Sequence, residues 1–196
     1  MLPTSPLRPQ PDDRLAFFQG FLKHPRQVGS IIPSSRFLER RITRAARLDR
    51  ADLIVELGPG TGGTTRALLR AMKPTARLLS IEIQPHFVRL LERMRDPRFA
   101  VQQGSAADLG RILAKRGLGA PDTIVSGIPF STMPRALGQQ VVRAVFDALE
   151  PGGLFVAYQV RDRVESLGNE VFGRARIQTE LLNVPPMRVY CWRKRG

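Results

Sequence analysis

The sequence is poor in several residue types on which particular folds and chemistries depend. Its 196 residues include one cysteine, Cys191, and two histidines. An internal disulfide is therefore excluded, and a metal site is not expected. No apolar run approaches the roughly 18 residues that span a bilayer, and the proline-rich, polar start of the chain does not resemble a signal peptide. We expect a single domain in the reducing cytoplasm.

Acidic residues are also scarce relative to basic ones. Lysine and arginine number 31 against 17 aspartates and glutamates, which gives a formal net charge of +14. A surface this basic attracts polyanions, namely nucleic acid or the anionic face of a membrane. The alternative is a charge that serves solubility and has no specific partner.

The first 50 residues differ in character from the rest. Prolines in residues 1–13 indicate a disordered tail. Residues 14–23 predict an amphipathic helix that contains three phenylalanines. Residues 36–48 predict a second helix whose apolar stripe we expect to pack on the sheet. Residues 14–50 thus form an expected helical extension of a domain over 51–196. The second helix carries a basic stripe of Arg36, Arg40, Arg44 and Arg47.

From residue 51 the pattern alternates between short apolar runs and helical segments, the longest of them over 134–150. The last part of the chain reads as two further strands joined through Asn183 and Pro185-Pro186. Alternation of this kind predicts an α/β fold with a mostly parallel sheet and helices on both faces. The expected strands before the final pair are 52–58, 77–83, 99–104, 122–128 and 154–160.

A glycine-rich loop, "ELGPGTG", follows the first of these strands and opens a helix. Its spacing differs from the G-x-G-x-x-G of dinucleotide-binding loops, and the next helix lacks the lysine of a P-loop. The loop resembles motif I of the class I S-adenosylmethionine (SAM) methyltransferases. This resemblance implies a doubly wound, Rossmann-like, seven-stranded sheet and SAM as cofactor. It assigns cofactor binding to Glu56, Gly58, Gly60 and Gly62.

A carboxyl group at the end of the next strand supports the same cofactor. Glu82 lies 20 residues after Gly62, where a carboxylate can accept hydrogen bonds from both ribose hydroxyls. The alternative for Glu82 is a solvated acid at a strand end. Ile83 would then pack on the adenine.

The end of the third strand departs from the methyltransferase pattern. Ser105-Ala106 stands where the superfamily often has Asp-Ala to hold adenine. Ser105 and Ala106 are nevertheless expected at the cofactor. Asp108 is a possible substitute for the missing aspartate, or else a helix N-cap.

Methyl transfer from a sulfonium needs proximity, orientation and a dry site rather than a metal or a nucleophilic side chain. An acceptor amine must be neutral, and an apolar pocket lowers the pKa of an alkylammonium. Phe130 and Tyr158 lie at expected carboxyl ends of strands, where an aromatic ring can hold a cationic group. Either ring could instead belong to the core.

Several motifs occur in order over about residues 16–195, namely "KHPRQ", "GSIIPSS", "ELGPGTG", "IEI", "SGIPF" and "NVPPMRVYCW". Together they are similar to the soluble bacterial phosphatidylethanolamine N-methyltransferases and, more distantly, to the rRNA adenine N6-dimethyltransferases. The resemblance implies that residues 32–34 cover the cofactor and that Ser126 contributes to its site.

Two departures separate the chain from the rRNA enzymes. Those enzymes carry Asn-Leu/Ile-Pro-Tyr, where the Asn accepts a hydrogen bond from adenine and the Tyr stacks on it. Here Gly127 and Phe130 stand at these positions. The rRNA enzymes also append a helical domain, whereas this sequence stops soon after its last expected strand. Gly127 would make room for an alkylamine and Phe130 would form part of an apolar wall.

We therefore expect a SAM-dependent N-methyltransferase that converts phosphatidylethanolamine stepwise towards phosphatidylcholine. Its expected partner is the inner face of the cytoplasmic membrane, bound through the helix over 14–23 and a basic surface. Nucleic acid is the less favoured partner. The alternatives are methylation of rRNA adenine, methylation of another aminolipid such as ornithine lipid, and a SAM-fold protein that binds RNA or membrane without turnover.

Overall fold

The computed structural model of the protein describes residues 35–196. The expected tail over 1–13, the expected helix over 14–23 and the motif residues 32–34 lie outside the described residues. The described residues belong to one unit, Ile32–Gly196.

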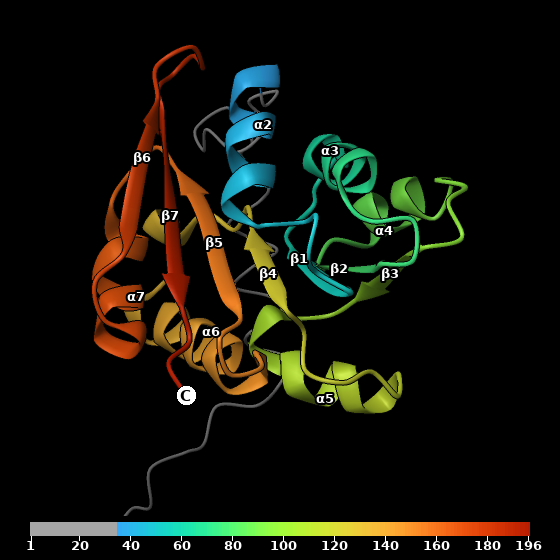
Figure 1. Cartoon of the computed structure of the whole chain (residues 1–196). Helices are drawn as coiled ribbons and strands as arrows, with labels where there is room; N and C mark the ends of the chain where they lie inside the picture. The colour runs from blue at the N-terminus through green and yellow to red at the C-terminus, as the bar shows by residue number, and fades with distance from the viewer. Residues whose placement is uncertain (1–34) are drawn as a thin grey trace, which may run out of the picture. The chain divides into compact units, whose positions relative to one another are not determined.

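Seven strands form one sheet in the order β3-β2-β1-β4-β5-β7-β6 (Figure 1). Neighbours are parallel except around β7, which runs antiparallel to both β5 and β6. The predicted doubly wound, mostly parallel seven-stranded sheet is confirmed. The strands are β1 Leu53–Leu57, β2 Arg77–Glu82, β3 Phe99–Gln103, β4 Thr123–Ser126, β5 Leu154–Gln159, β6 Arg176–Glu180 and β7 Met187–Arg193.

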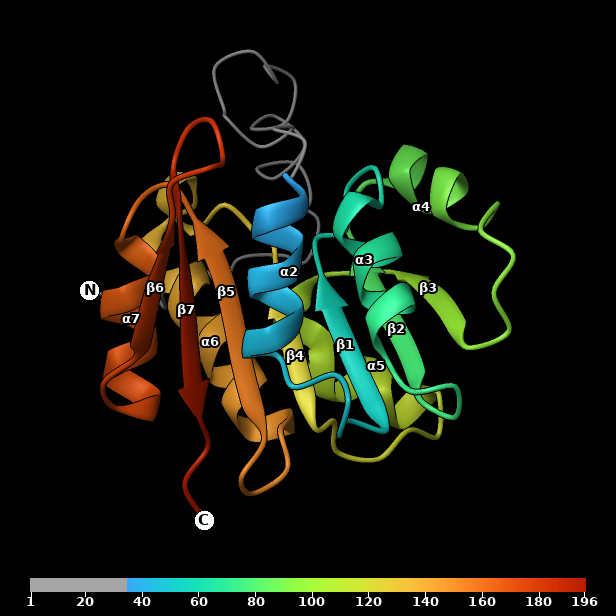
Figure 2. The ribbon, with the colours of Figure 1, turned by 45° about the horizontal axis from the view of Figure 1, so that its top comes forward.

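Helices cover both faces of the sheet. Figure 2 shows α2 and α3 on one face and α5, α6 and α7 on the other. Every residue of β1 and β4 is buried, as expected of central strands that helices cover on both sides. The helices are α2 Arg36–Ala45, α3 Gly63–Ala71, α4 Pro85–Leu91, α5 Leu109–Lys115, α6 Arg135–Ala148 and α7 Arg163–Phe172, with single 3-10 turns η1 Ala106–Asp108 and η2 Phe130–Thr132.

The helix expected over 36–48 is present as α2. Ser35 caps it, since its Oγ accepts a hydrogen bond from the N–H of Leu38 at 3.2 Å. Leu38 and Ile42 are fully buried and belong to the core cluster that includes Val125 of β4. The apolar stripe therefore packs on the sheet as predicted. Within the described part of the chain, no helix has the length and apolar composition needed to cross a bilayer.

One helix, α7, was not predicted. Val164 and Leu167 are buried, so the helical period is present in the sequence, but Gly168 interrupts it. A Cβ at Gly168 would lie 2.3 Å from Cζ2 of Trp192. The glycine is thus needed because the indole ring of β7 packs directly against the helix backbone.

Candidate functional site

The carboxyl ends of β1, β2 and β4 meet at one edge of the sheet. β1 pairs with β2 on one side and with β4 on the other, so the chain leaves β1 in one direction and later returns on the opposite side. A reversal of this kind creates a crevice outside the carboxyl ends of the strands, where ligands bind in open α/β sheets. The glycine loop, Glu82 and the "SGIPF" motif over 126–130 all lie at this edge.

Three glycines of the loop after β1 adopt left-handed backbone conformations. Gly58, Gly60 and Gly62 have φ values of 70°, 57° and 80°, which other residues rarely take. A Cβ at Gly62 would lie 2.3 Å from Cε of Met94, so that position is packed against protein. A Cβ at Gly60 would meet no described atom within 4 Å. Gly60 therefore presents bare backbone to open space, as loops that approach a ligand closely do.

Glu82 ends β2 and holds the glycine loop in place. Its Oε2 accepts a hydrogen bond from the N–H of Gly60 at 3.0 Å, and its Oε1 accepts one from the N–H of Gln84 at 2.9 Å. Burial raises the pKa of Glu82, while these hydrogen bonds act in the opposite direction. Each carboxylate oxygen has two acceptor positions. Glu82 can therefore hold the loop and still accept hydrogen bonds from a diol.

Glu56 is a buried carboxyl group in β1 with one unpartnered oxygen. Its Oε2 accepts hydrogen bonds from Ser80 Oγ at 2.6 Å and Thr65 Oγ1 at 2.7 Å. Its Oε1 has no hydrogen-bond partner within residues 35–196. Burial raises the pKa of Glu56 to about 7 against the effect of the two hydroxyls, and the charge of Glu82 adds to the rise. Glu56 can therefore accept one more hydrogen bond and titrates near neutral pH.

The two hydroxyl groups that hold Glu56 were not identified from the sequence. Ser80 lies directly beside Glu56 in the parallel register of β1 and β2. Its signal was a lone serine in the apolar run over 77–83. Thr65 lies in the first turn of α3, and only the packing of that helix on β1 brings its hydroxyl to Glu56.

Gly127 packs directly against the glycine loop and a tyrosine of β5. A Cβ at Gly127 would lie 2.4 Å from Oη of Tyr158 and 3.1 Å from the carbonyl oxygen of Gly58. The Tyr158 hydroxyl lies 3.0 Å from Oγ1 of Thr64. The space left by the missing side chain is therefore occupied by the tyrosine hydroxyl, whereas we expected it to accommodate the amine.

The two aromatic candidates take different positions. Tyr158 is half-buried, and burial together with the negative charge of Glu56 raises the pKa of its hydroxyl. The phenol therefore stays protonated at neutral pH. Phe130 is fully buried, and its Cδ1 lies 3.7 Å from the position of a Cβ on Gly138 of α6. Of the two roles considered for Phe130, the structure shows the core role, so its ring does not form an open wall of the site.

The polar side chains after β3 interact with residues that follow closely in the sequence. Ser105 Oγ accepts a hydrogen bond from the N–H of Ala107 at 3.2 Å, and Ala106 is buried. Asp108 stands before α5 but makes no capping hydrogen bond, and its carboxylate pairs with Arg111 at 3.2 Å. Neither polar side chain is free of protein contacts at this strand end.

The last residues of β4 and β5 and the first residue after β2 complete the edge. Ser126 is fully buried, and its Oγ accepts a hydrogen bond from the N–H of Ile128 at 3.3 Å. Gln159, which was not identified from the sequence, donates from Nε2 to the carbonyl of Ile128 at 2.6 Å. Ile83 follows β2 and is half-buried. Ser126 and Gln159 therefore fix the shape of the loop.

These groups fit S-adenosylmethionine, which carries a ribose diol and an amino group. Glu82 has remaining acceptor positions, Glu56 Oε1 is a buried acceptor without a partner, and Gly60 leaves its backbone open to the crevice. The donors of the cofactor would find acceptors here that residues 35–196 leave unused. Among the described residues, no three His, Cys, Asp or Glu side chains gather as metal ligands.

Comparisons with known proteins match most of the chain to methyltransferases. The family described as "Methyltransferase domain" matches residues 54–153. An ornithine lipid N-methyltransferase of Singulisphaera acidiphila is 33% identical over 181 residues, which cover 91% of this chain and 94% of that protein. The ribosomal RNA small subunit methyltransferase A of Caulobacter vibrioides is 28% identical over 73% of this chain but only 54% of its own length.

Solved structures share the fold at low sequence identity. A precorrin-6y C5,15-methyltransferase of Geobacter metallireducens has a TM-score of 0.66 at 14% identity, over 85% of this chain and 92% of that one. The N-methyltransferase NodS of Bradyrhizobium japonicum has a TM-score of 0.63 at 16% identity, over 84% and 100%. At these identities the likeness concerns the fold alone.

Proposed function

Because this chain belongs to the methyltransferase domain family, we propose that it transfers methyl groups from S-adenosylmethionine to the amine of a membrane lipid. Ornithine lipid is the first candidate, since the similar enzyme of Singulisphaera acidiphila is named for that substrate and matches over nearly its whole length. Phosphatidylethanolamine, methylated stepwise towards phosphatidylcholine, is the second. Both substrates present a primary alkylamine.

The observation that carries this proposal is the pairing of Gly127 with Tyr158. An aromatic amine needs a side-chain acceptor at position 127, because its lone pair is delocalised into the ring. Here the position has no side chain, and the Tyr158 hydroxyl takes the space at 2.4 Å from where a Cβ would lie. A hydroxyl that stays protonated can accept from or donate to an alkylamine without the planar grip that adenine requires.

The residues of the site bind and orient rather than react covalently. When bound, S-adenosylmethionine supplies a methyl group already activated on a sulfonium. In this proposal Glu82 and Gly60 hold the nucleoside, and Oε1 of Glu56, which has no partner within residues 35–196, holds the amino group. In this proposal, desolvation of the bound amine lowers the pKa of the acceptor ammonium, which starts near the value of about 10.4 for lysine.

The membrane partner is part of the same proposal. We expect the protein to act at the inner face of the cytoplasmic membrane, with the segment over 14–23 as one anchor, although that segment lies outside the described residues. Basic side chains near an anionic surface each contribute on the order of 1 kcal/mol. The net charge of +14 is consistent with this attraction.

The test is incubation of the full chain with methyl-labelled S-adenosylmethionine and three acceptors in parallel. These are vesicles that contain ornithine lipid, vesicles that contain phosphatidylethanolamine, and small-subunit rRNA. We expect label in one or both lipids and none in the RNA. Label in RNA alone would replace the proposal with the adenine methylation that was the alternative.

A further inference from the structure

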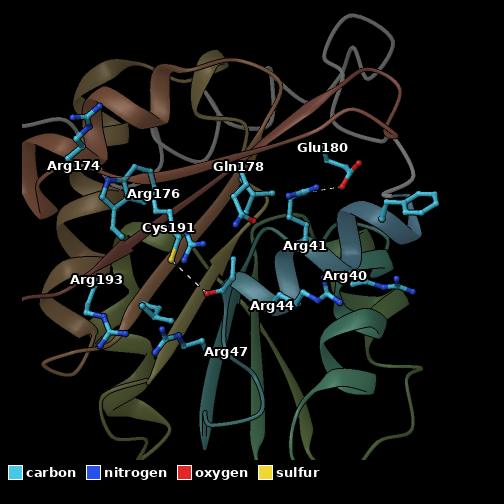
Figure 3. A pocket seen from close by; sticks show the side chains of 15 residues that line it. Arg40, Arg41, Arg44, Arg47, Arg174, Arg176, Gln178, Glu180, Cys191 and Arg193 are labelled. Carbon is cyan, nitrogen blue, oxygen red and sulfur yellow. Dashed lines mark hydrogen bonds and ion pairs between the residues drawn. The ribbon is translucent and has the colours of Figure 1, made fainter.

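A groove lined by arginines lies away from the glycine loop, between α2 and the strands β6 and β7 (Figure 3). Its cavity volume is about 710 Å³. We call it the arginine groove. Val189 and Cys191 of β7 lie at its floor, and the arginines that line it are Arg40, Arg41, Arg44, Arg47, Arg174, Arg176 and Arg193.

The positive charge of the arginine groove is almost uncompensated. Its one carboxylate, Glu180, accepts a hydrogen bond from Nε of Arg41 at 2.9 Å. Within residues 35–196, the other six arginines have no carboxylate within 4.0 Å. Guanidinium groups that face a common hollow without counter-ions repel one another, and a bound anion relieves that repulsion.

Three of these guanidinium groups lie close enough to the Cys191 thiol to lower its pKa, although they come from different parts of the chain. Arg47 follows α2, Arg176 begins β6 and Arg193 ends β7. Burial raises the pKa of the Cys191 thiol, and the charges of these three arginines lower it. The floor of the groove around Cys191 is therefore a focus of positive potential.

Arg47 holds its place in the groove at a conformational cost. Its φ is 48°, the only positive φ of a non-glycine residue within residues 35–196. Helices commonly end in this left-handed conformation at a glycine, which adopts it without strain. A strained residue is retained where its side chain has a use, and here that side chain is a guanidinium directed to the groove.

The turn between β6 and β7, residues 181–186, adds an apolar element beside the groove. In this hairpin tip, Leu181, Leu182 and Val184 are 72%, 63% and 86% exposed. Between them Asn183 is buried, since its Oδ1 accepts from the N–H of Ser35 at 2.9 Å and its Nδ2 donates to the carbonyl of Pro185. The tip is thus tied to the start of α2 while its aliphatic side chains face outward.

The arginine groove and the exposed aliphatic residues of the hairpin tip together favour a membrane over RNA as the anionic partner. Single-stranded RNA sites combine positive charge with exposed aromatic rings on which bases stack. Here the large exposed hydrophobic residues of the described chain are all aliphatic. Of the aromatic residues that line the groove, Phe37 is half-buried with the Arg36 guanidinium 5.0 Å from its ring centroid, and Trp192 is 1% exposed because its indole packs against α7. Aliphatic side chains beside a basic surface are instead typical of proteins that enter the interfacial layer of a bilayer.

We propose that the arginine groove and the hairpin tip together form a docking surface for anionic phospholipid, with the guanidinium groups on head-group phosphates and the tip in the interfacial layer. This proposal rests on the proposed lipid substrate and adds to it a second contact with the membrane, separate from the amine site. The docking surface binds anionic phospholipids that the enzyme does not methylate. Its role is to hold the enzyme at a surface rich in phosphate.

The first experiment measures binding to vesicles of phosphatidylcholine alone and with roughly 30% phosphatidylglycerol. The full chain is compared with Arg44→Gln/Arg47→Gln/Arg176→Gln. We expect the phosphatidylglycerol-dependent part of the binding to fall by about tenfold or more in the variant. The matched control, Arg77→Gln/Arg89→Gln/Arg95→Gln, removes three exposed arginines around β2 and α4 and should retain most of this binding.

A second pair of variants separates docking from folding. Arg47→Gly removes one guanidinium and suits the left-handed conformation, so its unfolding temperature should stay equal or rise while binding to phosphatidylglycerol weakens. Leu181→Ser/Leu182→Ser/Val184→Ser should weaken binding to both kinds of vesicle. Equal loss in the control and groove variants, undiminished binding in the groove variant, or tight RNA binding that the groove variant abolishes would each overturn the docking surface.

Activity on a short-chain, monomeric aminolipid distinguishes this proposal from the proposed function. If the docking surface is correct, the groove variant methylates the monomeric lipid at the rate of the unmodified chain but loses activity on anionic vesicles. Methylation of both substrates at the unmodified rate would refute the docking surface alone. Absence of lipid methylation in the unmodified chain would refute the proposed function, while its vesicle binding would still test the groove.

Discussion

Glu56 is a carboxyl group that the protein buries at a cost to its own stability. Its pKa rises from 4.5 to about 7 because burial disfavours the charged form. Between these two values the folded state binds more protons than the unfolded state, so stability falls as the pH rises. Above about pH 7 the whole cost is present, on the order of 3 kcal/mol. An oxygen that has no partner within residues 35–196 and is retained at such a cost supports the binding role proposed for it.

Replacement of Glu56 by glutamine should therefore stabilise the protein at neutral pH. Glutamine carries no charge to desolvate and can still contact Ser80 and Thr65. We expect Glu56→Gln to unfold at a higher temperature than the unmodified chain at about pH 8, with the difference shrinking towards about pH 4.5. Thermal unfolding of both proteins across this pH range measures whether the difference in unfolding temperature has the expected sign. A variant less stable than the unmodified chain at about pH 8 would contradict it.

Glu56→Gln should also weaken cofactor binding. The amide NH2 of glutamine replaces an acceptor oxygen, and it cannot accept a hydrogen bond from the amino group of the cofactor. Calorimetry with S-adenosylmethionine measures both affinities. A gain in stability with a loss of affinity is the trade-off expected of a strained functional group.

Gly127 leads to a second prediction at the scale of one residue. Gly127→Ala places a Cβ 2.4 Å from the Tyr158 hydroxyl, and overpacking of this kind costs about 1–3 kcal/mol of unfolding free energy. In Gly127→Ala/Tyr158→Phe that oxygen is absent, so part of the loss should be recovered. Denaturant unfolding of the two single variants and the double variant gives the coupling. Strict additivity of the changes in unfolding free energy would show that the side chains at positions 127 and 158 are not in contact.

At the scale of elements, α7 depends on the contact between its backbone and Trp192. The indole ring stacks on Phe155 at 5.3 Å between centroids, and its Nε1 donates to Asn169 Oδ1 at 3.0 Å. Because the ring is held on both sides, it cannot move away from a larger residue at position 168. The glycine therefore fixes how α7 lies on the sheet.

Gly168→Ala tests this contact. Alanine favours a helix interior over glycine by about 1 kcal/mol, whereas a Cβ 2.3 Å from Trp192 Cζ2 costs about 1–3 kcal/mol. We expect the clash to prevail and the free energy of unfolding to fall. The control Gly110→Ala lies in α5, where a Cβ meets no described atom within 4 Å, and it should stabilise. Stabilisation by both variants would rule out the Trp192 contact.

For the whole molecule, the excess of positive charge is the dominant electrostatic feature. The net charge of +14 lowers stability through self-repulsion. We expect the unfolding temperature to rise between about 20 mM and about 200 mM sodium chloride, because salt screens this repulsion. The rise should be smaller in the triple groove variant, which has lost three of the crowded charges. A decrease with salt would show that ion pairs outweigh repulsion.

Part of the molecule follows directly from local patterns in the sequence. The alternation of strands and helices predicted the sheet, and the apolar stripe of Leu38 and Ile42 predicted how α2 packs. The glycine loop and Glu82 were placed at one edge because the carboxyl ends of parallel strands coincide. In each case the signal lies within a few residues of the feature that it predicts.

The remainder depended on contacts between distant segments. The pKa of Glu56 rises only when neighbouring strands and helices bury it, and Ser80 of β2 and Thr65 of α3 hold its Oε2 only once the sheet and helix have packed. The arginine groove exists only because α2 lies beside β6 and β7, since its arginines are dispersed over more than 150 positions of the chain. By itself the sequence determined the fold and the cofactor edge, because periodicity and strand ends are local properties. Only the tertiary structure decided what occupies the space beside Gly127, what holds Glu56, and where the positive charge converges, because these arise from packing between elements.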